Sequence, residues 1–113
     1  MALIIRTDNT IAPVDEKHFV DKELPVHFLQ KTVKGYFKLL ALPKGLTIGN
    51  EIYYWMILNE EGKRHKLPKN YLATQYATKN IITKGEYVLG DVMLLKNAEL
   101  GFEDTSQGEQ YPE

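Results

Sequence analysis

The sequence predicts an α+β domain: a mostly antiparallel sheet of about five to six strands, one helix over about residues 23–34 and a second short helix over about 68–78. Short apolar, β-branched runs alternate with turn residues, one segment changes to a helical period, and the short connections disfavour a doubly wound parallel sheet. With 113 residues, the chain suits one domain. We expect a single compact domain over 1–100 and an acidic, flexible tail over 101–113, which carries four acidic residues and no basic one.

The N-terminal elements are predicted to be a pair of short strands. Residues 2–7 are rich in β-branched side chains and end at the turn pair Asp8-Asn9, and residues 11–14 are expected to return beside them. Pro13 is expected at a sheet edge or a strand end, because proline has no N–H to donate to a neighbouring strand.

The helix over about 23–34 follows from the spacing of its apolar residues. Val26, Leu29 and Val33 lie on one helical face, acidic residues stand at the start and Lys31 lies near the end, as the helix dipole favours. Gly35 follows directly, where a left-handed cap residue is expected.

The next strands are expected to form the strongest part of the sheet. Residues 36–42 are almost continuously apolar, which predicts a central strand that turns at 43–45. A short strand over 46–48 then precedes the two-residue turn Gly49-Asn50. Residues 51–58 give the clearest strand signal, and alternation assigns Ile52, Tyr54, Met56 and Leu58 to one face and Tyr53, Trp55 and Ile57 to the other.

The C-terminal elements complete the sheet. A tight turn over 59–62 is expected to lead into a return segment over 63–67. Pro68 is expected to open the second helix, and residues 86–96 form the last strand or strand pair, with a bulge or bend at Gly90-Asp91. The apolar side of the second helix holds Leu72, Ala73, Tyr76 and Ala77.

Charge is distributed unevenly although the net charge is only −1. Residues 1–30 carry a net charge of −2, residues 31–79 carry +6 and residues 80–113 carry −5. Such separation creates a local potential that steers partners if the basic segment forms one surface patch. If folding instead mixes residues of the three segments on the surface, their charges cancel and no such patch forms.

The basic arm, which we define as residues 63–69, is the sharpest local feature. It holds four cations in seven residues, and cations grip phosphates while nearby aromatic rings stack on bases. Candidate phosphate or nucleic-acid contacts are Lys31, Lys34, Lys63, Arg64, Lys66, Lys69 and Tyr71. Against this interpretation, the arm follows Glu60-Glu61 directly, and the overall charge is low for a nucleic-acid-binding domain.

Tyr53 and Trp55 are candidate interface residues, because tyrosine and tryptophan commonly anchor protein contacts. The strand that contains them is apolar on both faces. It therefore either packs beneath two layers, as a core strand, or meets another protein or a second copy of the chain.

No catalytic residue, metal site or cofactor is predicted. The chain has no cysteine, its one serine is Ser106 in the acidic tail, and its three histidines lack the spacing of a metal-ligand motif. An enzymatic function would require Asp91, His65 and Glu86 to converge in one cavity. No apolar run reaches the ~20 residues that a membrane span needs, so we expect no membrane association.

Three stretches together resemble a known family: residues 29–37 (LQKTVKGYF), residues 58–74 (LNEEGK, then LPKN and AT) and residues 88–95 (VLGDVMLL). The family is a small one known only as a domain of unknown function (number 3846), from phages, plasmids and gut bacteria, and the resemblance spans roughly residues 2–97. The chain departs from it at residues 44–51, which lengthen the hairpin, and at Lys34, where the family often has glycine. The resemblance implies a compact α+β domain from a mobile element, and it implies no activity.

The leading hypothesis is therefore a small non-enzymatic binding protein of a phage or mobile element. It would act in the cytoplasm of the host cell, through contact with a host protein or other macromolecule or through self-association. The alternative is nucleic-acid or nucleotide-ligand binding through the basic arm, and such phosphate contacts weaken steeply as salt rises.

Overall fold

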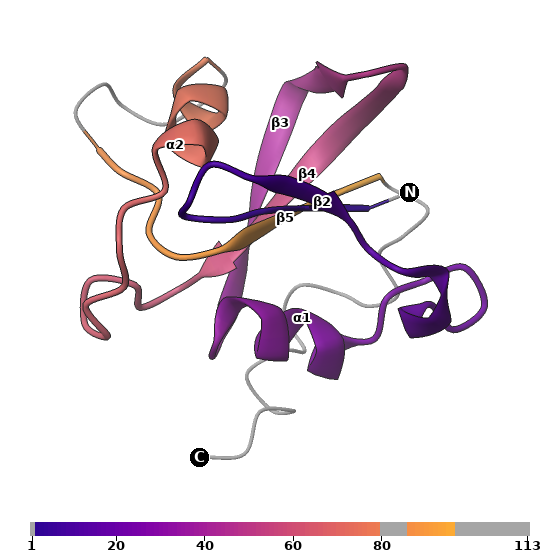
Figure 1. Cartoon of the computed structure of the whole chain (residues 1–113), viewed down its shortest axis with the longest axis horizontal. Coiled ribbons are helices and arrows are strands. Elements are labelled where there is room, and N and C mark those ends of the chain that lie inside the picture. Colours follow the sequence, from indigo (N-terminus) through magenta and orange to yellow (C-terminus); the bar gives the residue numbers. More distant parts are fainter. Residues whose placement is uncertain (1, 80–85, 97–113) are drawn as a thin grey trace.

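Five strands form one antiparallel sheet in the computed structural model, which describes residues 2–79 and 86–96. The strand order is β2-β1-β5-β4-β3, so the α+β prediction is confirmed (Figure 1). The described elements are β1 (Leu3–Ile5), β2 (Ile11–Pro13), the 3-10 turn η1 (Glu16–His18), α1 (Val26–Val33), β3 (Phe37–Ile48), β4 (Glu51–Asn59), α2 (Tyr71–Thr78) and β5 (Val92–Leu95).

The N-terminal hairpin lies at one edge of the sheet, as expected. β1 pairs antiparallel with β2, and Pro13 stands opposite Leu3 on the outer strand, where its missing N–H costs no ladder bond. The Asp8 carboxylate accepts hydrogen bonds from the backbone N–H and the hydroxyl of Thr10, which fixes the turn between the strands.

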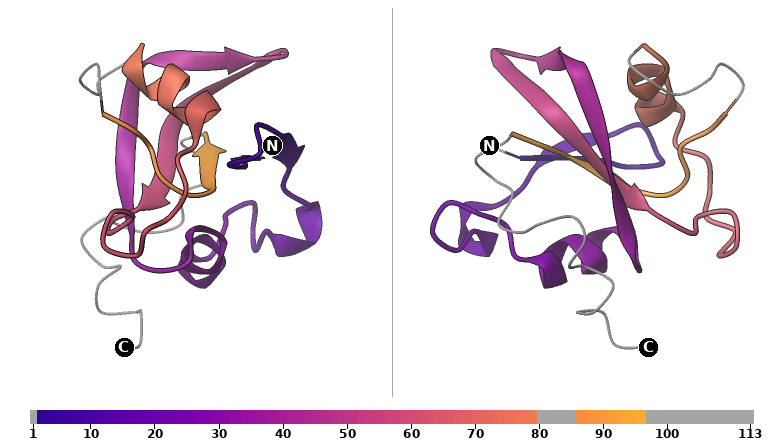
Figure 2. Two further views of the ribbon diagram at one scale, coloured as in Figure 1. Left: turned by 60° about the vertical axis from the view of Figure 1, so that its left-hand side comes forward. Right: turned by 180° about the vertical axis from the view of Figure 1, so that it is seen from behind.

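β5 lies at the centre of the sheet and is buried on both faces. It pairs with β1 on one side and β4 on the other. Its residues divide between two hydrophobic clusters, Val92 and Leu94 in the first and Met93 and Leu95 in the second. The first cluster includes α2 residues and the second includes α1 residues, so the two helices cover opposite faces. Figures 1 and 2 show α2 above β5 and α1 below it.

The prediction for β3 was wrong in two respects. β3 is an edge strand, not a central one, and it continues through residues 43–45, which were expected to turn. Its pairing shifts between Ala41, opposite Trp55, and Leu46, opposite Tyr53. Four residues of β3 therefore stand opposite Tyr54 alone, and this bulge accommodates Pro43 without a hairpin turn. The turn predicted at Gly49-Asn50 is confirmed.

The bulge also overturns the predicted faces of β4. Tyr53 packs with Met56 and Leu58 in the first cluster, whereas Trp55 and Ile57 contact the second cluster. Simple alternation placed Tyr53 beside Trp55. It fails because a bulge changes which way the following side chains point.

The helices are shorter than predicted. α1 begins after Pro25, and Glu23 instead forms an isolated bridge with Val20. The left-handed residue at its end is Lys34, at φ 67°, not Gly35. Gly35 also has a positive φ, 154°, which residues with a side chain rarely adopt, and a Cβ there would lie 3.1 Å from the Asn59 amide nitrogen.

α2 begins at Tyr71 instead of Pro68, and its predicted apolar side is confirmed. The segment 63–67 does not form a return strand and belongs to a series of turns. Only residues 92–95 of the predicted last strand pair as a strand, because the chain bends at Gly90. The acidic segment 101–113 lies outside the described residues.

Candidate binding surface

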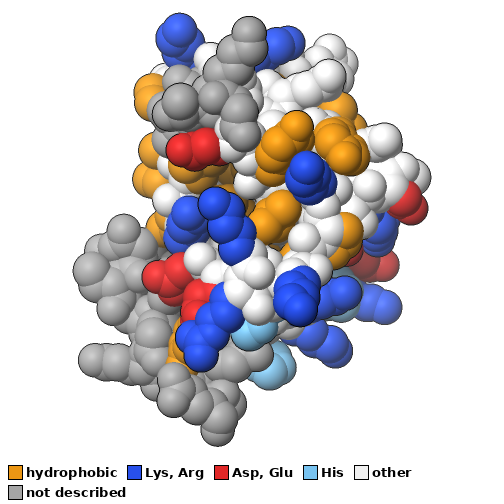
Figure 3. Space-filling view, turned by 90° about the vertical axis from the view of Figure 1, so that its left-hand side faces the viewer, with side chains coloured by type: hydrophobic (Ala, Val, Ile, Leu, Met, Phe, Trp, Pro, Cys, Tyr) orange, Lys and Arg blue, Asp and Glu red, His pale blue; other side chains and the backbone are white. Residues whose placement is uncertain are grey.

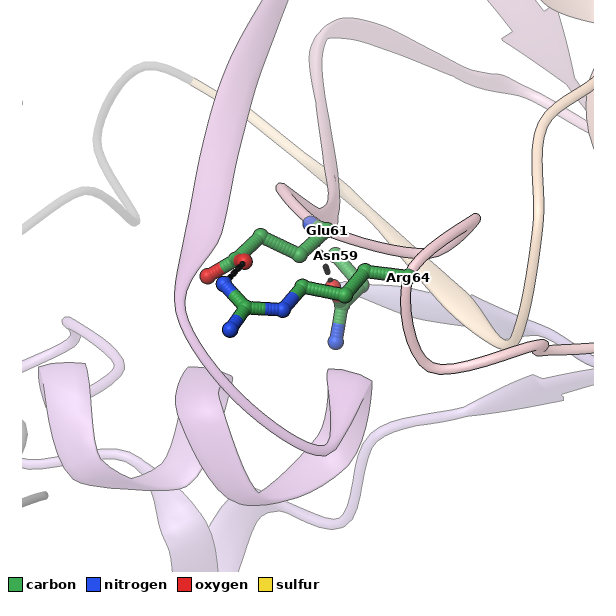
Figure 4. Close-up of polar contacts among 3 residues, drawn as sticks. All are labelled: Asn59, Glu61 and Arg64. Carbon is green, nitrogen blue, oxygen red and sulfur yellow. Dashed lines mark hydrogen bonds and ion pairs between the residues drawn. The ribbon is translucent and has the colours of Figure 1, made fainter.

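Asn59 fixes the turns that carry the basic arm against the rest of the fold. It ends β4 and is 6% exposed. Its amide nitrogen donates to the carbonyl of Val33 at the end of α1, 2.9 Å away, and its side-chain oxygen accepts from the Glu61 N–H at 2.7 Å. Figure 4 shows the second of these bonds beside the Glu61–Arg64 ion pair. The turns over 60–66 therefore have a defined position.

Asn70 performs a similar role between α2 and the sheet. Its buried amide nitrogen donates to the carbonyls of Ile5 and Gly90, both 2.9 Å away, and its oxygen accepts from the Ala73 N–H as the α2 N-cap. Thr74 extends this network, since its hydroxyl oxygen accepts from the N–H of Val88. Asparagine before a helix is a recognisable capping signal, but the bonds to distant strands could not be predicted from sequence.

Both asparagines belong to the stretches on which the predicted family resemblance depends. Asn59, Asn70, Thr74 and Gly90 all belong to the stretches that carry it, and each takes part in a structural hydrogen bond. Asp91 likewise accepts from the Thr7 N–H, 3.0 Å away. These residues of the motif stretches therefore join turns to strands.

A cleft of about 430 Å³ lies beside these turns, and we call it the charged cleft. β3, the turns after β4 and the segment before β5 contribute to its lining. Its walls carry three cations and three acids, namely Lys38, Lys63, Arg64, Glu60, Glu61 and Glu86. Arg64 and Glu61 form an ion pair at 2.8 Å. The lining thus has no net charge.

An exposed pair of tyrosines adjoins the charged cleft. Tyr71, on α2, and Tyr87, which lines the cleft, contact edge to face with ring centroids 6.0 Å apart. They are 55% and 45% exposed, and the Lys69 ammonium lies 4.2 Å above the Tyr87 ring. We call these three residues the aromatic corner. Figure 3 shows acidic and basic side chains side by side on this face, next to a group of hydrophobic side chains.

The structure brings only part of the predicted phosphate-binding set together. Lys63 and Arg64 line the charged cleft, and Lys69 and Tyr71 belong to the aromatic corner. Lys31 does not line this cleft and instead lines a separate cavity on α1. Exposed positions outside both linings are occupied by Lys34 and Lys66.

The two candidate interface residues are mostly packed inside the domain. Tyr53 is 1% exposed and lies in the first hydrophobic cluster, so it offers no contact surface in this structure. Trp55 is half-buried against the second cluster. The exposed aromatic residue of β4 is Tyr54, which lies with Ile52 close to Gly45 in the bulge. Sequence analysis missed it because the bulge was not predicted.

The geometry does not assemble the enzymatic arrangement considered above. Glu86 lines the charged cleft, whereas His65 and Asp91 do not. Among residues 2–79 and 86–96, no group of three His, Asp or Glu side chains could hold a metal ion. Neither helix of this part of the chain has the length and apolar character needed to cross a membrane.

Comparison of the chain with protein-family models, curated proteins and solved structures found no match. The resemblance to the phage and plasmid family therefore stays a prediction, and the function must be argued from the surface itself.

Proposed function

We propose that the chain is a small non-enzymatic binding protein of a phage or mobile element, and that it acts in the host cytoplasm by contact with a host protein. The contact surface in this proposal is the aromatic corner together with the charged cleft. The observation that carries the proposal is the exposed edge-to-face pair of Tyr71 and Tyr87 at the border of a cleft with balanced charge.

Exposed tyrosines favour a protein contact on physical grounds. A tyrosine ring provides a large apolar area and a hydroxyl for hydrogen bonding, at little cost in conformational entropy. Contact between the two rings restricts both of them before any partner binds, which lowers the entropy lost on association. Neighbouring charges of both signs give orientation, because they complement a surface with the opposite arrangement.

The balanced charge argues against the nucleic-acid alternative. Phosphate binding gains affinity from several unpaired cations that displace counterions. Here Arg64 is paired with Glu61, and Glu60 and Glu86 stand in the same lining as Lys63. A polyanion approaching the cleft would meet three carboxylates as well as three cations.

Capture from host lysate tests the proposal. We expect the wild-type chain to retain a host protein after nuclease treatment, and the double variant Tyr71→Ser/Tyr87→Ser to lose it. The matched control is Ile52→Ser/Tyr54→Ser, which removes two other exposed apolar side chains and should retain it. Capture that nuclease abolishes would support the nucleic-acid alternative, and capture that both double variants retain would contradict the assigned surface. A native mass of twice the chain mass that falls in the Tyr71/Tyr87 variant would identify the partner as a second copy.

A further inference from the structure

A second pocket, open to solvent over much of its extent and about 630 Å³ in volume, lies between η1 and α1, and we call it the basic cavity. It shares no lining residue with the charged cleft. Its size falls within the range of small-molecule sites, roughly 300–1,000 Å³. The proposed protein contact does not use it.

The basic cavity differs from the charged cleft in the charge of its lining, which is positive instead of balanced. Its ionisable side chains come in two pairs, Lys17 and His18 from η1 and His27 and Lys31 from α1. None of its lining residues is acidic. His27 and Lys31 stand four residues apart on α1, which places both on one side of the helix.

Ring stacking holds the two elements together. The His18 imidazole stacks on the Phe28 ring with centroids 4.3 Å apart and planes 26° apart. The Asp15 carboxylate accepts a hydrogen bond from the Lys17 N–H and so caps η1. Apolar atoms complete the lining, from Ile4, Pro25 and Phe28.

This combination suits an anion attached to an apolar group. Lysine ammonium groups bind phosphate as point charges, and an imidazole N–H adds a directed donor. A metal ion fits less well, because the lining offers two imidazoles and no carboxylate. Glu16, Asp21 and Glu23 lie in the same part of the chain but outside the lining, so recognition depends on direct contact with the four basic side chains more than on a long-range potential.

We propose that the basic cavity binds a small organic phosphate. Its phosphate group contacts the two lysines and the two histidines of the lining, and its apolar part rests against the apolar lining atoms of Ile4, Pro25 and Phe28. The site is independent of the protein contact proposed above, so either can fail without the other.

Titration with phenyl phosphate, followed by amide chemical shifts of the full chain, tests this site. We expect saturable chemical-shift changes centred on η1 and α1. The affinity for phenyl phosphate should be at least about tenfold higher than for inorganic phosphate or phenol. Inorganic phosphate contacts only the basic side chains of the lining, and phenol contacts mainly the apolar ones. Lys17→Gln/Lys31→Gln should weaken binding about tenfold or more. Lys34→Gln/Lys66→Gln removes the same charge from two exposed positions outside both linings and should leave the affinity unchanged.

Three results would overturn the proposal. Shifts that never saturate would show that the cavity is not a site. An equal loss in both double variants would show non-specific attraction to positive charge. Equal affinities for phenyl phosphate and inorganic phosphate would show an adventitious ion only. All four lysines are exposed, so we expect both variants to fold, and a urea unfolding curve of each checks this.

Discussion

Replacement of Asn70 by alanine removes three hydrogen bonds from one fully buried side chain. The carbonyls of Ile5 and Gly90 lose their amide donor, and the Ala73 N–H loses its cap. Each unsatisfied buried group costs about 1–3 kcal/mol, and loss of an N-cap costs about 1 kcal/mol. Even the lower end of these ranges gives about 3 kcal/mol, a large part of the 5–15 kcal/mol typical of a domain.

Urea unfolding measures this cost. With a slope of about 1.5 kcal/mol per molar, 3 kcal/mol lowers the unfolding midpoint by about 2 M. Asn50→Ala is the matched control, because Asn50 is exposed in the turn between β3 and β4 and should change stability by less than about 0.5 kcal/mol.

Asn70→Asp separates the two roles of the side chain. Aspartate caps a helix as well as asparagine does, so a residue that acted only as a cap would tolerate it. Aspartate has no N–H, and its second oxygen would face two carbonyl oxygens, so we expect it to destabilise at least as much as alanine does. A wild-type midpoint for Asn70→Asp would refute the assigned role.

Three further predictions concern other parts of the fold. Tyr53→Ala should lower the free energy of unfolding by about 3–5 kcal/mol, because the side chain is 1% exposed; a value below 1 kcal/mol in urea unfolding would place Tyr53 outside the core. Gly62→Ala should cost about 1–3 kcal/mol by the same assay, since a Cβ would lie 2.9 Å from that of Leu89, and no loss would show that the contact relaxes freely. A hydrogen bond from Lys96 lowers the pKa of the Glu51 carboxylate. The contribution of this pair to folding stability is therefore fully present above about pH 5 and is lost as the pH falls through the lowered pKa. Unfolding curves between about pH 6 and pH 3 should therefore show a smaller acid loss in Glu51→Gln than in wild type, and identical losses would contradict the pairing.

Much of the fold could be predicted because local signals and tertiary structure agree. The N-terminal strands, the turn at Gly49-Asn50 and the apolar side of α2 depend on short-range spacing, and the structure confirms them. Boundaries were less accurate. α1 begins later than predicted, because Pro25 restricts the residue before it to an extended conformation and so keeps Leu24 outside the helix.

The errors occur where tertiary structure overrides local pattern. The bulge opposite Tyr54 has no short-range signal that separates it from a turn, since proline, lysine and glycine suit both. Because this bulge was not predicted, Tyr53 was assigned to the wrong face of the sheet, and the exposure of Tyr54 was not predicted. Strand order is also non-local, and apolar character alone assigned the centre of the sheet to β3 instead of β5.

The candidate surfaces were predictable in composition and not in arrangement. The basic arm is recognisable from sequence. One of the acidic residues that balance its charge in the cleft, Glu86, is distant along the chain, so this balance could not be predicted. Tyr87 was not singled out, because only the fold places it against Tyr71. The histidines lacked any motif spacing, and His18 meets α1 through packing of its ring on Phe28.

The most direct test of the proposed function is the equilibrium affinity for the captured host protein at about 50 and about 300 mM salt. Two variants are compared with wild type, Tyr71→Ser/Tyr87→Ser and Lys63→Glu/Arg64→Glu. We predict at least a tenfold loss for the tyrosine variant at both salt concentrations, and only a modest change for the charge variant. Affinity that falls steeply with salt in wild type, is abolished by the charge variant and is unaffected by the tyrosine variant would contradict the proposal.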